Sequence, residues 1–145
     1  MLIETIDKLL ELSKKKGYSN ENIELIKKAY DIAYEYSKNR FRYRKKDRPF
    51  INHLISTCSI LICTNVNIET VVAGLLHSVK DDMKKIYDLN PIVGQIVDNY
   101  FDITVGKREN IKFDEINHIE WAILAIQLAN STDMLMAQEI SSPDC

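Results

Sequence analysis

The stretch IETVVAGLLHSV, residues 68–79, places its apolar side chains on one side of a helix. Those side chains recur three and four residues apart, at Ile68, Val71, Val72, Leu75, Leu76 and Val79. This spacing predicts an amphipathic α-helix that buries the apolar stripe. Asn67 precedes the stripe, and its side chain can cap the helix by accepting a hydrogen bond from a first-turn amide. The segment therefore predicts a buried helix that begins after Asn67.

Other stripes with the same period lie on both sides of this segment. Ser19 with Glu21 marks the start of one helix, whose apolar residues are Ile23, Ile26, Ala29, Tyr30 and Ala33. The next stripe consists of Leu54, Cys58, Leu61 and Ile62. Pro91 fits the first turn of a further helix, which is expected to bury Ile92, Val93, Ile96, Val97 and Tyr100. A long helical pattern then runs from about residue 114 to residue 138.

These patterns predict an all-α fold, because no alternating run is long enough to indicate a strand. Residues 1–140 are expected to form a single domain, and residues 141–145 a frayed tail. Trp121, the one tryptophan, is expected in the core.

Length and composition describe an ordinary globular chain. It has 145 residues, of which 46% are hydrophobic and 28% charged. A formal net charge of -2 disfavours a nucleic-acid binder that acts through bulk positive charge, and no apolar run has the length of a membrane span. Cys58, Cys63 and Cys145 lack the CxxC spacing of a thiolate zinc site, and an odd count argues against a disulfide framework. A cytoplasmic protein with reduced thiols is expected.

Positive charge is concentrated in residues 38–48, called here the basic segment. Its cations are Lys38, Arg40, Arg42, Arg44, Lys45, Lys46 and Arg48, and Asp47 is the one acid among them. One interpretation is a solvated loop whose cations offset the dipole of a preceding helix. The other is a phosphate clamp, since guanidinium groups match phosphate oxygens with two parallel hydrogen bonds. The residues alone leave both interpretations open.

Two histidines complete the set of notable residues. His53 ends the segment PFINH, residues 49–53, and His77 follows the apolar helix described above. Each histidine by itself is most simply a structural residue.

In combination, these segments resemble a known family. Arg44-Lys45, PFINH at residues 49–53 and AGLLHSVKDD at residues 73–82 are similar to the HD-domain hydrolases of the RelA/SpoT class. These enzymes remove the 3′-pyrophosphate from guanosine tetra- and pentaphosphate, the alarmones of the stringent response. The resemblance extends over roughly residues 20–136 and implies an HD-type helical domain of about six or seven helices. It also implies one divalent metal, usually manganese, held by two histidines and two aspartates.

The resemblance assigns roles to three pairs of residues. His53 and His77 match the metal-binding histidines. Arg44 and Lys45 match the residues that contact the nucleotide, and Asp81 and Asp82 match a catalytic pair that positions or activates the nucleophile.

The two aspartates of the metal site are replaced. Ser78 and Asn130 stand where the family has them. Hard cations prefer anionic oxygen ligands, so manganese is expected to bind weakly or not at all. Asp133, one helical turn beyond Asn130, would need a shifted helix to reach the site and is not expected there.

The sequence thus predicts a degenerate guanosine-3′,5′-bis(diphosphate) 3′-pyrophosphohydrolase domain that is weakly active or inactive. One alternative is a non-catalytic nucleotide- or RNA-binding module that uses the basic segment. Another is a folded remnant that acts only through protein interactions. A guanine nucleotide is the expected partner, a membrane is not, nucleic acid is disfavoured by the net charge, and the oligomeric state is left open.

Overall fold

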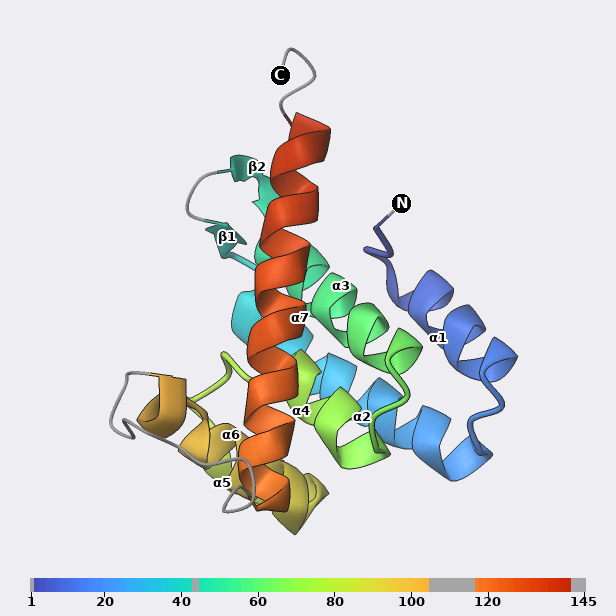
Figure 1. Ribbon diagram of the computed structural model, residues 1–145, viewed down its shortest axis with the longest axis vertical. Helices are drawn as coiled ribbons and strands as arrows, with labels where there is room; N and C mark the ends of the chain where they lie inside the picture. The colour runs from blue at the N-terminus through green and yellow to red at the C-terminus, as the bar shows by residue number, and fades with distance from the viewer. Residues whose placement is uncertain (1, 43–44, 105–116, 142–145) are drawn as a thin grey trace.

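The computed structural model describes residues 2–42, 45–104 and 117–141, without the side chains of residues 41–47, 101–104 and 137–141. In these ranges it contains seven helices and one two-stranded hairpin (Figure 1). The elements are α1 (Ile6–Lys15), α2 (Asn20–Ser37), β1 (Phe41–Arg42), β2 (Lys45–Pro49), α3 (Phe50–Cys63), α4 (Ile68–Leu76), α5 (Met83–Leu89), α6 (Pro91–Thr104) and α7 (His118–Ser141). The predicted all-α fold with about six or seven helices is confirmed.

Three helices begin where the sequence predicts, each with its capping hydrogen bond. Ser19 Oγ accepts from the amide of Asn22 at 3.1 Å, at the start of α2. Asn67 Oδ1 accepts from the amide of Thr70 at 2.9 Å, at the start of α4. At the start of α6, Asn90 Oδ1 accepts from two amides of the first turn, at 2.9 and 3.1 Å. These bonds satisfy donors that a helix N-terminus leaves without partners.

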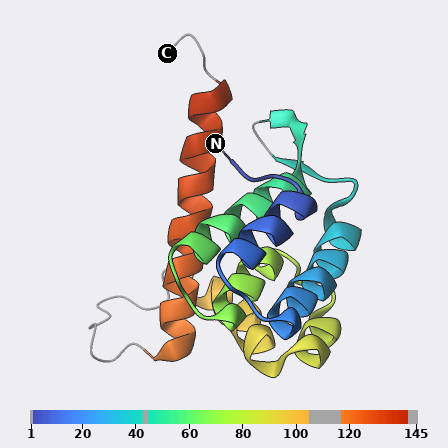
Figure 2. The same cartoon turned by 90° about the vertical axis from the view of Figure 1, so that its right-hand side faces the viewer.

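Helix α3 occupies the centre of the domain. It packs against α1, α2, α4 and α7, and the long α7 runs across α3 and α4, as Figures 1 and 2 show. The interior formed by these helices is apolar, and its largest fully buried side chains include Leu54, Ile55, Leu61, Leu75, Leu76 and Ile126.

A glycine lets α4 approach α3 closely. A Cβ atom at Gly74 would lie 2.2 Å from Leu61 Cδ1, closer than any van der Waals contact. The absence of a side chain at Gly74 therefore allows the two helices to pack tightly.

Several elements differ from the sequence predictions. Helices α1 and α5 and the β1–β2 hairpin were not predicted. Helix α4 ends at Leu76, before the end of its apolar stripe, and Val79 stays buried because a turn closes from its amide to the carbonyl of Leu76 at 2.9 Å. Ser141, assigned to the frayed tail, is the last residue of α7, and residues 142–145 lie outside the described ranges.

Two large apolar residues are more exposed than expected. Ile92 and Trp121 each expose 47% of their surface. Ile92 is in the first turn of α6, where the chain enters the helix from the surface. Trp121 lies on the outer face of α7, and its neighbour Ala122 is the one that faces the core. The expectation that Trp121 packs in the core is wrong.

Within the described residues, no helix combines the length and the apolar character needed to cross a membrane.

The two cysteines of α3 differ in environment, which gives a testable prediction. Burial raises the pKa of the Cys58 thiol from 9.0 to about 12, whereas Cys63 is exposed. Because the thiolate is the reactive species, iodoacetamide at pH 8 should alkylate Cys63 and spare Cys58 in the native protein. Peptide mass spectrometry measures both, and the same reaction in guanidinium chloride should label both. Equal labelling of the two in the native protein would contradict the buried position of Cys58.

Candidate functional site

His53 and His77 lie next to each other in the interior. His53 is in the first turn of α3, and His77 is the C-cap residue of α4. Their ring centroids are 6.0 Å apart with an interplanar angle of 72°, an edge-to-face arrangement. Both residues are buried, with 1% and 4% of their surface exposed. The two histidines that the resemblance assigns to one metal site are therefore neighbours in the fold.

Each imidazole is oriented by a hydrogen bond from its Nδ1 atom. His53 Nδ1 donates to Asp133 Oδ2 at 2.5 Å, and His77 Nδ1 donates to the carbonyl oxygen of Gly74 at 2.7 Å. A carbonyl and an ionised carboxylate can only accept, so Nδ1 carries the proton in both rings. When such a ring is neutral, its lone pair is on Nε2.

Asp133, on α7, is the carboxylate of this site, and its presence corrects the sequence prediction. Its side chain is fully buried against His53. Asn130, expected at the site, is half-exposed and donates a long hydrogen bond from Nδ2 to Met134 Sδ at 3.8 Å. Helix periodicity explains the difference: Asp133 lies four residues beyond Ala129 and seven beyond Ile126, both of which are buried. That stripe was the signal in the sequence that could have identified Asp133.

Arg48, the last cation of the basic segment, binds this carboxylate from the end of β2. Arg48 Nη2 donates to Asp133 Oδ1 at 2.9 Å, and Nη1 donates to Oδ2 at 3.1 Å. Arg48 Nε donates to Glu4 Oε1 at 2.9 Å. The Arg48 side chain is only 8% exposed. Arg48 is therefore an internal partner of Asp133, which neither interpretation of the basic segment predicted.

The protonation of the pair follows from these contacts. Burial of the Asp133 carboxyl raises its pKa, but the hydrogen bonds from His53 and Arg48 lower it by more, so the pKa lies well below the ordinary 3.8. Burial lowers the pKa of Arg48, and the contacts with Asp133 and Glu4 raise it by more, so the pKa lies above its ordinary value. Both groups are therefore charged at neutral pH.

This donor set does not fit a hard divalent cation. The part of the chain that the structure describes contains no group of three or more His, Cys, Asp and Glu side chains that could hold a metal ion. Both oxygens of Asp133 already accept hydrogen bonds from a cation. Ser78, the residue in place of the second aspartate, offers only a hydroxyl group, and hard cations need anionic oxygen.

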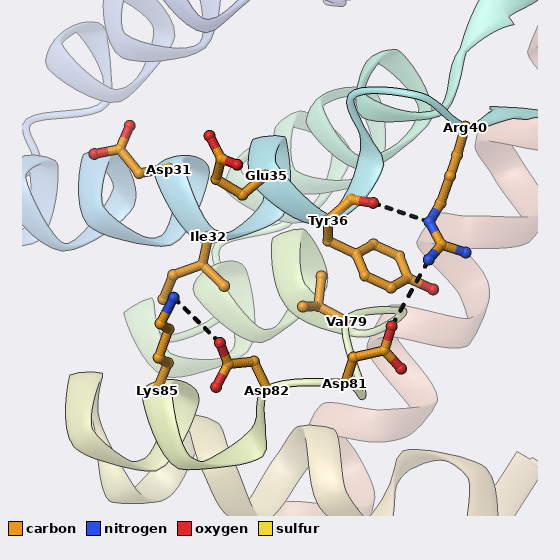
Figure 3. Close-up of a pocket in the computed structure, with 9 residues that line it drawn as sticks. All are labelled: Asp31, Ile32, Glu35, Tyr36, Arg40, Val79, Asp81, Asp82 and Lys85. Carbon is orange, nitrogen blue, oxygen red and sulfur yellow. Dashed lines mark hydrogen bonds and ion pairs between the residues drawn. The ribbon is translucent and has the colours of Figure 1, made fainter.

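Asp81 and Asp82 lie in a surface pocket of about 470 Å³ (Figure 3). The pocket is lined by Asp31, Ile32, Glu35, Tyr36, Arg40, Val79, Asp81, Asp82 and Lys85, and thus by neither imidazole. Asp81 Oδ2 is 3.7 Å from Arg40 Nη2, and Asp82 Oδ2 is 3.2 Å from Lys85 Nζ. The two carboxylates predicted to be catalytic are thus each paired with a cation at the surface.

One wall of this pocket combines a cation with an aromatic ring. The Arg40 guanidinium lies 4.1 Å from the centroid of the Tyr36 ring, and its Nε donates to the Tyr36 carbonyl at 2.9 Å. In Figure 3, Ile32 and Tyr36 point from α2 toward Val79 and Asp81.

The side chains of the two residues predicted to contact the nucleotide, Arg44 and Lys45, lie outside the described part of the structure. Arg44 lies outside the described residues. Lys45 belongs to β2, where its backbone pairs with Arg42, and its side chain lies outside the described part as well.

Comparison with known proteins gives distant relatives of one kind. A protein named GTP pyrophosphokinase from Streptomyces antibioticus is 31% identical over 102 residues, which cover 66% of this chain. A GTP pyrophosphokinase from Streptomyces coelicolor is 32% identical over 96 residues, also 66% of the chain. A probable GTP pyrophosphokinase from Mycobacterium leprae is 28% identical over 68 residues, or 47% of the chain. No protein-family model matches the chain.

The matched segment is a small part of these relatives. It spans 11% of each Streptomyces protein and 8% of the Mycobacterium protein. The chain is therefore distantly related to a short segment of proteins named GTP pyrophosphokinase.

Proposed function

We propose that this chain is a degenerate HD-type alarmone pyrophosphohydrolase domain that binds a guanine nucleotide without hydrolysing it. The names of its relatives support a setting in guanine-nucleotide metabolism. The adjacent His53 and His77, at the positions that the resemblance assigns to metal ligands, support the HD type. The proposed loss of hydrolysis rests on one observation: the Arg48 guanidinium donates hydrogen bonds to both carboxylate oxygens of Asp133.

The chemistry of hydrolysis explains why this contact matters. A bound metal ion lowers the pKa of a water molecule, so that hydroxide is available near neutral pH. Two imidazoles without an available carboxylate neither hold a hard cation firmly nor balance its charge. We therefore expect manganese to be weakly bound or absent, and pyrophosphate to stay attached to the nucleotide.

Nucleotide binding would combine the pocket with the basic segment. The apolar floor of Ile32 and Val79, beside the stacked Tyr36 and Arg40, suits a base. The lining has four carboxylates and two cations, so it does not suit phosphates. The phosphates would instead contact Arg44 and Lys45 of the basic segment.

The test is a titration with guanosine tetraphosphate combined with a hydrolysis assay. We expect binding in the micromolar range, independent of manganese, and no hydrolysis above background even in excess manganese. Replacing both Arg44 and Lys45 with alanine should weaken binding by about 2–3 kcal/mol, because charge-assisted hydrogen bonds are lost. In the matched control, Lys14 and Lys15, which lie in the last turn of α1, are replaced with alanine. This variant should bind the nucleotide with the affinity of the unmodified protein.

Two outcomes decide the hydrolysis question. Turnover that requires manganese and disappears in His77→Ala would overturn the proposed loss of activity. Turnover that persists in His77→Ala would come from a contaminant, because it would not depend on the site.

A second candidate function, protein interaction, is favoured by the outer face of α7. Trp121, Leu128 and Leu135 are spaced seven residues apart and expose 47%, 71% and 64% of their surface. Residues at this spacing share one face of a helix. Failure of the unmodified protein to bind the nucleotide at high micromolar concentration would favour this candidate. For either function the cytoplasm is the compartment that we propose.

A further inference from the structure

We infer that Arg48 is a built-in cation that takes over the electrostatic role of a divalent metal at Asp133, so that arginine and metal exclude each other. This inference rests on the proposed absence of metal-dependent hydrolysis. Arg48 would then be the cause of that absence, because it neutralises the Asp133 carboxylate in place of a metal.

The first argument is the charge of the interior. Asp133 is fully buried and ionised, and a buried carboxylate needs an opposite charge close by. Arg48 provides that charge in a planar, bidentate arrangement at 2.9 and 3.1 Å. The histidine that touches the same carboxylate donates through Nδ1, so the carboxylate has its hydrogen-bond partners without any ion.

The second argument is competition for the same oxygen atoms. A hard divalent cation bonds to carboxylate oxygens at about 2.0–2.6 Å. It would need the lone pairs that Arg48 uses on Oδ1 and Oδ2. A metal beside a guanidinium would also place three positive charges next to a single buried carboxylate, and like charges a few ångströms apart repel strongly in the interior.

The third argument is that a second carboxylate, Glu4, also holds the Arg48 guanidinium. Glu4, in the segment before α1, accepts from Arg48 Nε at 2.9 Å and lies 2.7 Å from Nη2. The guanidinium is thus held by Glu4 and Asp133 on two adjacent edges, which together form a clamp, and the Arg48 side chain is 8% exposed. Metal entry would require the whole clamp to open, and a neutral side chain at position 48 removes this barrier.

The test compares two variants of the full chain by thermal unfolding with and without millimolar Mn²⁺. Arg48→Gln removes the charge, and Arg48→Lys is the matched control that keeps it. We expect Arg48→Gln to unfold at a lower temperature than the wild type and to regain at least about 4 °C with Mn²⁺, because a ligand of the folded state alone raises the unfolding temperature. The wild type and Arg48→Lys should shift by less than about 1 °C.

Further variants make each outcome decisive. Arg48→Gln/Asp133→Asn should lose the Mn²⁺ effect, and a persistent effect would mean that the ion binds elsewhere. Stabilisation of the wild type by Mn²⁺, or no response of Arg48→Gln, would also overturn the inference. If Arg48→Gln is unfolded without metal, recovery of its helical circular dichroism in Mn²⁺ supports the inference and failure to recover overturns it. The readout involves no nucleotide, so the proposed function and this inference can fail separately.

Discussion

Replacing Asp133 with alanine should lower the free energy of unfolding by about 3–5 kcal/mol, as is typical when one member of a buried ion pair is removed. The Arg48 side chain, 8% exposed, would keep its charge and lose two hydrogen bonds. His53 would lose the acceptor of its Nδ1 proton at the same time. Urea unfolding followed by circular dichroism measures the change.

A surface carboxylate provides the control for this measurement. Asp81 forms its ion pair with Arg40 at 3.7 Å, and its side chain is 74% exposed. Asp81→Ala should therefore cost less than about 1 kcal/mol. The double variant Arg48→Met/Asp133→Leu should recover much of the loss, since apolar residues can replace a buried pair. An Asp133→Ala protein as stable as Asp81→Ala would show that the buried pair does not hold the domain together.

Replacing Gly74 with valine should destabilise the domain by about 3 kcal/mol, the upper end of the usual cost of overpacking a core. The new Cβ would lie 2.2 Å from Leu61 Cδ1, and Leu61 is 1% exposed, so its side chain has no open space to enter. Helices α3 and α4 must then separate. Chemical denaturation gives the free energy of unfolding.

Gly94, in α6, provides the matched control. A Cβ there would lie 2.5 Å from the Tyr87 ring. Tyr87 is half-buried, and its hydroxyl donates to the exposed Asp98 at 2.8 Å. The ring can therefore turn toward solvent, and Gly94→Val should cost less than Gly74→Val. Equal losses of unfolding free energy in the two variants would mean that Leu61, between α3 and α4, moves aside as easily as the Tyr87 ring.

Much of the helical framework was predictable, because it depends on local chemistry. Ser19, Asn67 and Asn90 cap helices through side-chain oxygens, and the apolar stripes of those helices form faces in the core. The elements that were missed are short or depend on tertiary packing. Strand β1 has two residues and α5 has seven. Neither is long enough for apolar residues to repeat with a recognisable strand or helix period.

The candidate site was predicted in part for a similar reason. His53 and His77 belong to helices whose stripes must pack together, so their proximity follows from the sequence pattern. Asp133 was not expected at the site because the resemblance assigns that position to Asn130, although the buried stripe of α7 passes through Asp133. Arg48 was treated as one of several surface cations, because residue type alone does not reveal a partner 85 positions away.

The large sequence separation between Arg48 and Asp133 also affects how the chain folds as it is synthesised. Arg48 joins Glu4 across 44 positions and Asp133 across 85. At a ribosomal rate of about 5–20 residues per second, Asp133 is added about 4–17 s after Arg48. During that interval α1 to α4 have no Asp133 carboxylate for the guanidinium and lack the helix that covers α3 and α4. The last helix thus completes the interior, and a nascent chain that stops before residue 133 is an unfinished domain rather than a smaller one.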